Sequence, residues 1–199
     1  MLEQGFEAFS SLTTINPEIS TQELMRQLAP PPEFVKARFE NYVPDAQFPS
    51  QAQAVEKAKE FVTPKRAKLF GKSTPSLGLY LDGGFGVGKT HLLAAIWHGF
   101  DGQKAFGSFL EFTSLVGYLG FAASVQELSK YQLICIDEFE LDDPGDTMLM
   151  SRFLKELAAK GVRFAATSNT PPAALGEGRF AADSFQREIQ SVADKFQMV

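Results

Sequence analysis

Near its middle the chain reads Gly83-Gly84-Phe85-Gly86-Val87-Gly88-Lys89-Thr90, which matches the pattern G-x-x-x-x-G-K-[ST] in full. Glycines let the backbone curl so that successive N–H groups point at phosphate oxygens, and the N-terminus of the helix that follows adds a favourable dipole. In such a loop Lys89 would reach the β- and γ-phosphates of a nucleotide, and the Thr90 hydroxyl would bind Mg²⁺. The motif therefore predicts a phosphate-binding loop.

The sequence on either side of the motif supports this interpretation. Residues 77–81 form a short apolar run rich in strand-forming residues, and a helix is predicted from near Gly88 to Phe100. The alternative is a glycine-rich turn that fits the pattern by chance. Because the motif lies between a predicted strand and a predicted helix, which is the context that a phosphate-binding loop requires, we favour the first interpretation.

Beyond the motif, predicted strands alternate with predicted helices. Strands are predicted over residues 105–112, 133–136 and 162–167, and helices around residues 115–119, with Thr113 as N-cap, and after Pro144. Such alternation is typical of βαβ units and of a mostly parallel sheet covered on both faces. The sequence therefore predicts an α/β protein with three layers, a sheet between two layers of helices.

Two carboxylates end one of these predicted strands. Asp137 and Glu138 directly follow the apolar residues 133–136, and the carboxyl ends of parallel strands lie at the rim where ligands bind. There Asp137 would hold Mg²⁺ through water, and Glu138 would orient and polarise an attacking water molecule. The alternative is an acidic strand end that faces solvent.

A third group of candidate residues follows the strand predicted over residues 162–167. Asn169 would lie at the same rim, where its amide can donate to a phosphate oxygen and accept from water. Arg179 and Arg187 come next, and an arginine that completes a neighbour's site can stabilise the charge of a transition state. Each of these arginines has the alternative of being an ordinary surface residue.

Composition narrows the class of protein. The chain has 199 residues and a net charge of −5, with one cysteine, Cys135. These figures predict one globular domain, give no whole-surface attraction to nucleic acid, and exclude an internal disulfide or a cysteine-based zinc site. Residues 1–20 lack the pattern of a secretory signal, so we expect a cytoplasmic protein whose membrane association is peripheral at most. A GTPase is disfavoured because the chain has no Asn-Lys-x-Asp motif.

The N-terminal part differs in character from the rest. Ser20 and Glu23 have the spacing of a capping box at the start of a helix that Pro30 would end, and a second helix is predicted after Pro49. Six bases lie close together from within this helix onward, at Lys57, Lys59, Lys65, Arg66, Lys68 and Lys72. They form either a solvated face or a contact for phosphate or an acidic partner. We predict an extension over residues 1–32 and a core over residues 33–199.

The order of these residues indicates a family. With Lys89, Asp137, Glu138 and Asn169 in sequence on alternating strands, the chain resembles an AAA+ ATPase of the P-loop NTPase class. Four segments, 39–45, 135–149, 161–162 and 166–172, look more narrowly like the ZapE cell-division ATPases and their mitochondrial relatives. The resemblance covers roughly Glu33 to Val199.

The resemblance implies several further expectations. Members of the family are oligomeric Mg²⁺-dependent ATP hydrolases that act in bacterial cell division and are associated with FtsZ. By analogy Asn169 is the sensor-1 residue, Arg179 is the first choice for the arginine finger, and residues 39–43 border the adenine. The family chain also continues past Val199, with the rest of a strand and a small helical lid.

Two other functions stay open at this point. One is a nucleic-acid-associated AAA+ module of the helicase-loader type, supported in composition only by the bases between Lys57 and Lys72. The other is a nucleotide-binding switch with little hydrolysis. We favour an ATP hydrolase that remodels or regulates a protein partner.

Overall fold

A parallel sheet forms the centre of the computed structural model, which describes residues 19–63, 78–140, 143–171 and 196–198. Its strands are β1 (Gly78–Asp82), β2 (Lys104–Ser108), β3 (Leu133–Asp137), β4 (Arg163–Ser168) and β5 (Phe196–Met198). They lie in the order β2-β3-β4-β1-β5, and each pairing is parallel. The parallel sheet expected from the alternation of elements is therefore confirmed.

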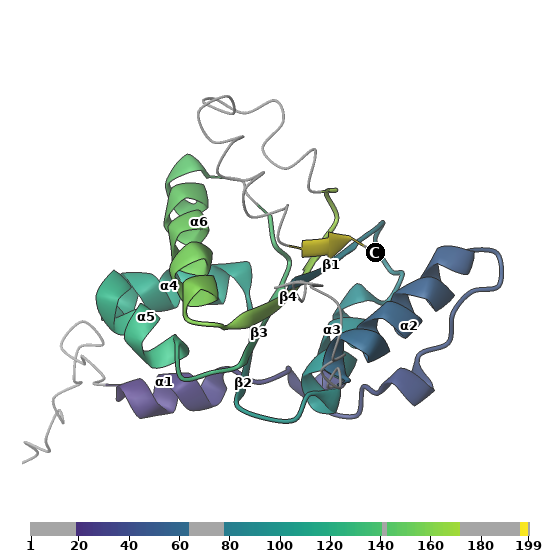
Figure 1. The fold of residues 1–199 in the computed structure, drawn as a ribbon, viewed down its shortest axis with the longest axis horizontal. Coiled ribbons are helices and arrows are strands. Elements are labelled where there is room, and N and C mark those ends of the chain that lie inside the picture. Colours follow the sequence, from purple (N-terminus) through teal and green to yellow (C-terminus); the bar gives the residue numbers. More distant parts are fainter. Residues whose placement is uncertain (1–18, 64–77, 141–142, 172–195, 199) are drawn as a thin grey trace, which may run out of the picture.

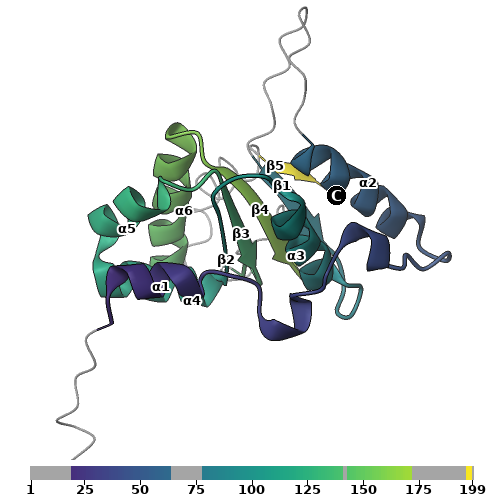
Figure 2. The same ribbon diagram turned by 90° about the horizontal axis from the view of Figure 1, so that it is seen from below.

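Helices cover both faces of the sheet (Figures 1 and 2). α2 (Pro49–Val62) and α3 (Lys89–Gly99) lie on one face, and α4 (Phe109–Leu119), α5 (Phe121–Leu128) and α6 (Pro144–Ala159) lie on the other. Successive strand residues point to opposite faces, so Ile134 packs with the second group of helices and Cys135 with the first. Burial of both faces explains why these strands read as continuous apolar runs.

The connection between β2 and α4 differs from the prediction. We predicted a strand over residues 105–112 and an N-cap at Thr113, but β2 ends at Ser108 and α4 begins at Phe109. Ser108 Oγ accepts a hydrogen bond from the Glu111 N–H at 3.2 Å, and the Glu111 carboxylate accepts one from the Ser108 N–H at 2.6 Å. This reciprocal capping box places the N-cap five residues earlier than the predicted Thr113.

The N-terminal helix packs against the edge of the sheet. α1 (Thr21–Gln27) has Ser20 as its N-cap, and the Ser20 hydroxyl accepts from the Glu23 N–H at 3.2 Å, which is one of the two hydrogen bonds of the predicted capping box. Leu28 is buried with the residues of α4 to α6, and its carbonyl accepts from the Phe106 N–H at 3.0 Å. This contact occupies part of the free edge of β2. The boundary between residues 32 and 33 stays a prediction.

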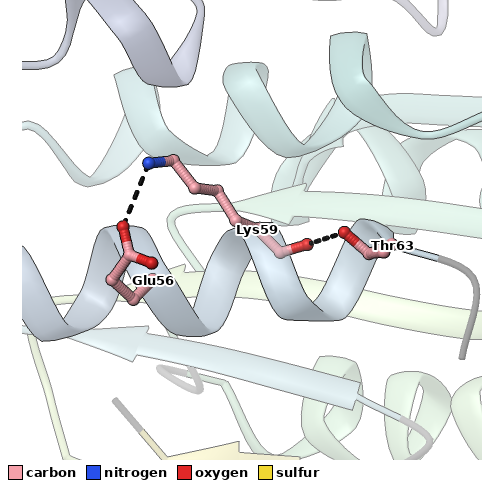
Figure 3. Close-up of polar contacts among 3 residues, drawn as sticks. All are labelled: Glu56, Lys59 and Thr63. Carbon is pink, nitrogen blue, oxygen red and sulfur yellow. Dashed lines mark hydrogen bonds and ion pairs between the residues drawn. The ribbon is translucent and has the colours of Figure 1, made fainter.

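Only two of the six bases of the predicted basic cluster lie in the described part of the chain. These are Lys57 and Lys59, both on α2; Lys65, Arg66, Lys68 and Lys72 lie outside the described residues. Lys59 Nζ forms an ion pair with Glu56 at 3.0 Å, and the Lys59 carbonyl accepts from the Thr63 hydroxyl at 2.7 Å (Figure 3). The Lys59 charge is therefore already paired with a carboxylate.

None of the helices in the described ranges combines the length and the apolar character needed to cross a bilayer.

Candidate active site

The glycine-rich loop joins β1 to α3 with backbone angles that favour glycine. Gly86 has φ 77° and Gly88 has φ 86°, both in the left-handed region. A Cβ at Gly88 would also lie 2.7 Å from Cε2 of Tyr42. The Tyr42 hydroxyl donates to the Val87 carbonyl at 2.7 Å, so this side chain from the segment before α2 packs against the end of the loop.

Lys89, the first residue of α3, points back into the loop. Its Nζ donates to the carbonyl oxygens of Gly83 and Gly84, both at 2.7 Å, and to Oδ1 of Asn169 at 2.9 Å. Desolvation is the largest influence on this lysine and lowers its pKa, while the nearby charge of Asp137 opposes the shift. A partly desolvated ammonium group held by neutral acceptors is well suited to bind phosphate oxygens.

Thr90 and Asp137 meet at the carboxyl end of β3. The Thr90 hydroxyl donates to Oδ1 of Asp137 at 3.2 Å, and the hydroxyl of Thr167 on β4 donates to the same oxygen. Hydroxyl and carboxylate oxygens suit Mg²⁺, which keeps several waters and is usually shared with substrate phosphates. No group of three or more His, Cys, Asp or Glu side chains able to hold a metal occurs in the described ranges. The residues therefore fit a magnesium ion that arrives with a nucleotide.

Glu138 has an unusual backbone conformation. Its φ is 53°, which is uncommon for a residue with a side chain and is often found at functional sites. The Glu138 N–H donates to the Thr167 hydroxyl at 3.0 Å, which holds the turn after β3 against β4. The carboxylate is exposed and lines the same cavity as Lys89 and Asp137.

Two cavities lie on either side of the loop. The first, of about 290 Å³, brings together Lys89, Thr90, Asp137, Glu138 and Asn169 with three further residues of the predicted loop, which are Phe85, Gly86 and Gly88. The second, of about 390 Å³, is lined by apolar groups of Tyr42, Phe48, Ala54, Leu81 and Val87. Phosphates fit the first cavity, where charged and hydroxyl side chains come together, and a flat base fits the second, whose lining also includes the polar residues Ser50, Gln51, Asp82 and Lys89.

Two of the predicted site residues lie outside the described part of the chain, and two residues that contact the site were not predicted. Arg179 and Arg187 lie outside the described residues, and the roles given to the other site residues stay predictions. Thr167 and Glu140 were not predicted as site residues, although both make hydrogen bonds to them. The sequence contained a signal for Thr167, because the hydroxyl residues Thr167 and Ser168 directly precede Asn169, which was predicted to lie at the rim of the site.

Comparison with known families gives a match over nearly the whole chain. The profile of the family described as AFG1-like ATPase matches residues 18–199. Two curated relatives, the cell division protein ZapE of Escherichia coli K12 and that of Escherichia coli O157:H7, are each 35% identical over 121 residues. Each match covers 53% of this chain and 32% of the relative, so the chain spans about a third of these proteins.

Solved structures share the fold at low identity. The structure of DnaI has a TM-score of 0.61 at 20% identity, covering 85% of this chain and 93% of that one. The AMPPCP-bound DnaA of Aquifex aeolicus has a TM-score of 0.60 at 18% identity, covering 83% and 50%. The DnaC helicase loader has a TM-score of 0.58 at 17% identity, covering 84% and 98%. The predicted α/β fold of the AAA+ P-loop type is confirmed.

Proposed function

The chain belongs to the AFG1-like ATPase family, and from this premise we propose that it is a Mg²⁺-dependent ATP hydrolase that remodels or regulates a protein partner. One observation carries the proposal: five residues from the start of α3 and from the ends of β3 and β4 line one cavity beside the glycine-rich loop, namely Lys89, Thr90, Asp137, Glu138 and Asn169. Each has the functional group that phosphoryl transfer to water requires.

Nucleotide binding would use both cavities. The N–H groups of the loop and the Lys89 ammonium would hold the phosphates, which would replace the carbonyl oxygens of Gly83 and Gly84 that now accept from Nζ. The adenine would lie in the apolar cavity beside Tyr42, next to the segment that the family resemblance assigns to it. Thr90 and Asp137 would hold Mg²⁺, which neutralises charge on the phosphates.

Hydrolysis would then depend on Glu138. Its exposed carboxylate can accept a hydrogen bond from a water molecule in the cavity and polarise it for attack on the γ-phosphate. Asn169 lines the same cavity, and its amide can contact the phosphate or the water while its oxygen orients Lys89. Arg179 stays our first choice for the finger supplied to a neighbouring subunit of a homo-oligomer.

The test compares two substitutions. Lys89→Ala should abolish or severely weaken ATP binding, because the loop loses its only side-chain cation. Glu138→Gln should keep binding and lower turnover by a factor of about 10² to 10⁴, the usual contribution of a general base. Binding is measured with a fluorescent ATP analogue, and turnover by phosphate release with Mg²⁺ and ATP.

Two surface variants serve as matched controls for this experiment. Lys130→Ala and Glu156→Gln change residues of exposed ion pairs away from the cavity and should leave both quantities unchanged. Equal loss of binding in Lys89→Ala and Glu138→Gln would contradict the role given to Glu138. A wild-type protein that binds ATP but releases almost no phosphate would favour the nucleotide-binding switch.

The partner would be a division protein, with FtsZ as the first candidate, in the cytoplasm. The matched relatives are named as cell division proteins, which supports this choice. Glu138→Gln should accumulate the ATP-bound form, so a pull-down with that variant in the presence of ATP should retain the partner. Loss of the partner when Lys89→Ala is added to the same variant would support nucleotide-dependent binding.

A helicase-loader function is the second candidate, because the fold is shared with the DnaC helicase loader. It predicts salt-sensitive binding to single-stranded DNA that weakens when the bases from Lys57 to Lys72 are neutralised. Absence of binding at low salt would remove this candidate.

A further inference from the structure

Glu140 stands at the point where the turn after β3 meets the end of β4. The Phe139 N–H donates to the Thr167 carbonyl at 2.7 Å, and the Phe139 ring is buried against Tyr80 and Phe109. This anchor holds the segment that carries Glu138 and Glu140 along the carboxyl end of β4. The Glu140 side chain is half-buried there.

The Glu140 carboxylate accepts hydrogen bonds from three consecutive residues. Oε1 accepts from the Ser168 hydroxyl at 3.0 Å and from the Asn169 N–H at 2.9 Å, and Oε2 accepts from the Thr170 hydroxyl at 3.1 Å. β4 ends at Ser168, so the Asn169 N–H lies beyond the strand hydrogen bonds. The carboxylate supplies the acceptor that this N–H would otherwise lack.

The residue held in this way is the one that contacts Lys89. Oδ1 of Asn169 accepts from Lys89 Nζ at 2.9 Å, and its neighbours are fixed as well: the Thr170 N–H donates to the Ser168 hydroxyl, and the Tyr80 hydroxyl donates to the Thr170 carbonyl, both at 2.9 Å. Hydrogen bonds to an ionised carboxylate are among the stronger ones in proteins, so Glu140 dominates this network.

We propose that Glu140 is a positioning residue that fixes Asn169 beside Lys89 and thereby sets the position of Asn169 relative to Glu138, which lines the same cavity. Glu140 lies two residues after Glu138, and its carboxylate binds the backbone of Asn169. The short segment from Glu138 to Glu140 therefore links Glu138 with Asn169, and the proposed hydrolysis depends on the relative position of these two residues. The inference rests on the proposed ATPase function, because it assigns Glu140 a task in that reaction.

The first test separates positioning from binding. Glu140→Ala should lower kcat by about ten-fold or more, because displacement of a catalytic group by a fraction of an ångström has effects of that order. The KM for ATP should change little, since Glu140 does not line the cavity. Glu140→Gln keeps an oxygen for Ser168 and Asn169 and turns its NH₂ group to the Thr170 hydroxyl, so it should restore most of kcat. An unchanged kcat in Glu140→Ala would overturn the proposal.

A double-mutant cycle asks whether Glu140 acts through Asn169. If it does, adding Glu140→Ala to Asn169→Ala should lower kcat no further, because the group being positioned is already gone. Full additivity of the two effects would overturn the proposal. Glu156→Gln, a glutamate on the exposed side of α6, is the control for a general effect of charge.

Amide hydrogen exchange keeps the inference testable even if the protein hydrolyses no ATP. In the nucleotide-free protein, Glu140→Ala should speed exchange at Asn169 while exchange at the buried strand residues of β3 stays slow. Thr170→Val, which removes one donor to Oε2, should cause a smaller increase and replaces Glu140→Ala should that variant fail to fold. Unchanged protection at Asn169 would contradict the inference, whereas loss of hydrolysis in the wild type would contradict only the proposed function.

Discussion

At the scale of single residues, one hydroxyl orders both acidic groups of the site. Thr167 Oγ1 donates to the carboxylate of Asp137 and accepts from the Glu138 N–H. The side chain is buried, at 2% exposure, so water cannot replace it easily. Its position determines where the proposed magnesium ligand and the proposed base lie relative to each other.

Thr167→Val tests this arrangement because it keeps the shape and removes both hydrogen bonds. We expect the free energy of unfolding to fall by about 1–3 kcal/mol, since the Glu138 N–H loses its acceptor, and kcat to fall more than the affinity for ATP. Chemical unfolding and phosphate release measure the two effects. Thr167→Ser retains the hydroxyl and should stay close to the wild type; equal damage from both variants would contradict the role of the hydroxyl.

The residues that line the candidate site were predictable from sequence where a motif or the end of a predicted strand marks them. Lys89 and Thr90 belong to a contiguous pattern, and Asp137 with Glu138 ends an apolar strand, so each carries a local signal. Glu140 carries none, because its role depends on residues about thirty positions later that the sheet brings alongside. Contacts between strands cannot be inferred from either strand by itself.

At the scale of secondary-structure elements, the start of α3 combines two separate constraints. Gly88 has a left-handed backbone and is also covered by the Tyr42 ring. Gly86 is left-handed with open space around it, and Gly84 has open space and no positive φ. These three glycines of the loop therefore differ in their backbone conformation and in the atoms that a Cβ would contact.

Alanine substitutions at these glycines should destabilise the nucleotide-free protein by an amount that increases from Gly84 to Gly86 to Gly88. Gly84→Ala should be nearly neutral, Gly86→Ala should cost roughly 1–2 kcal/mol for the left-handed conformation, and Gly88→Ala should cost more because its Cβ also meets Tyr42. Thermal unfolding of the three variants measures the order. A Gly88→Ala protein as stable as Gly84→Ala would contradict the packing described here.

Element boundaries were predicted well where the chain changes composition sharply. The helix after Gly88 and the strand before Asp137 match the observed α3 and β3. The start of α4 was predicted wrongly because the apolar residues Phe109, Leu110 and Phe112 were given the period of a strand. The capping pair Ser108 and Glu111 was the better signal, since two reciprocal hydrogen bonds fix a helix start locally.

At the scale of the whole molecule, alternation of elements predicted the layers but could not give the order of the strands. Each crossover can place its strand on either side of its predecessor, and the choice depends on packing of helices that are distant in sequence. β3 lies between β2 and β4, and β1 lies between β4 and β5. This order is what brings Lys89 and Asp137 to either side of β4.

Stability should also respond to alkaline pH through Cys135 in the centre of β3. Complete burial raises the pKa of this thiol far above its ordinary value of 9.0. The folded state then keeps a proton that the unfolded state releases, so stability falls as pH rises above 9, by about 1.4 kcal/mol per pH unit. Comparison with Cys135→Ala isolates this contribution from that of other groups.

Urea unfolding of both proteins between pH 8 and pH 10.5 provides the measurement. The difference in free energy of unfolding between wild type and Cys135→Ala should be constant near pH 8 and should shift against the wild type above pH 9. A difference that does not change with pH would mean that the thiol ionises equally well in the folded state.

The place of β4 in the sheet also bears on how the chain acquires its site as it is synthesised. β4 pairs with β1 and with β3 but follows both in sequence. Because a nascent chain emerges from its N-terminus, the strands that carry the glycine-rich loop and Asp137 leave the ribosome before the strand that joins them. The proposed binding of ATP would have to wait until β4 has taken its place between β1 and β3. A nucleotide that binds this site would then stabilise only those chains in which β4 is already paired with both β1 and β3.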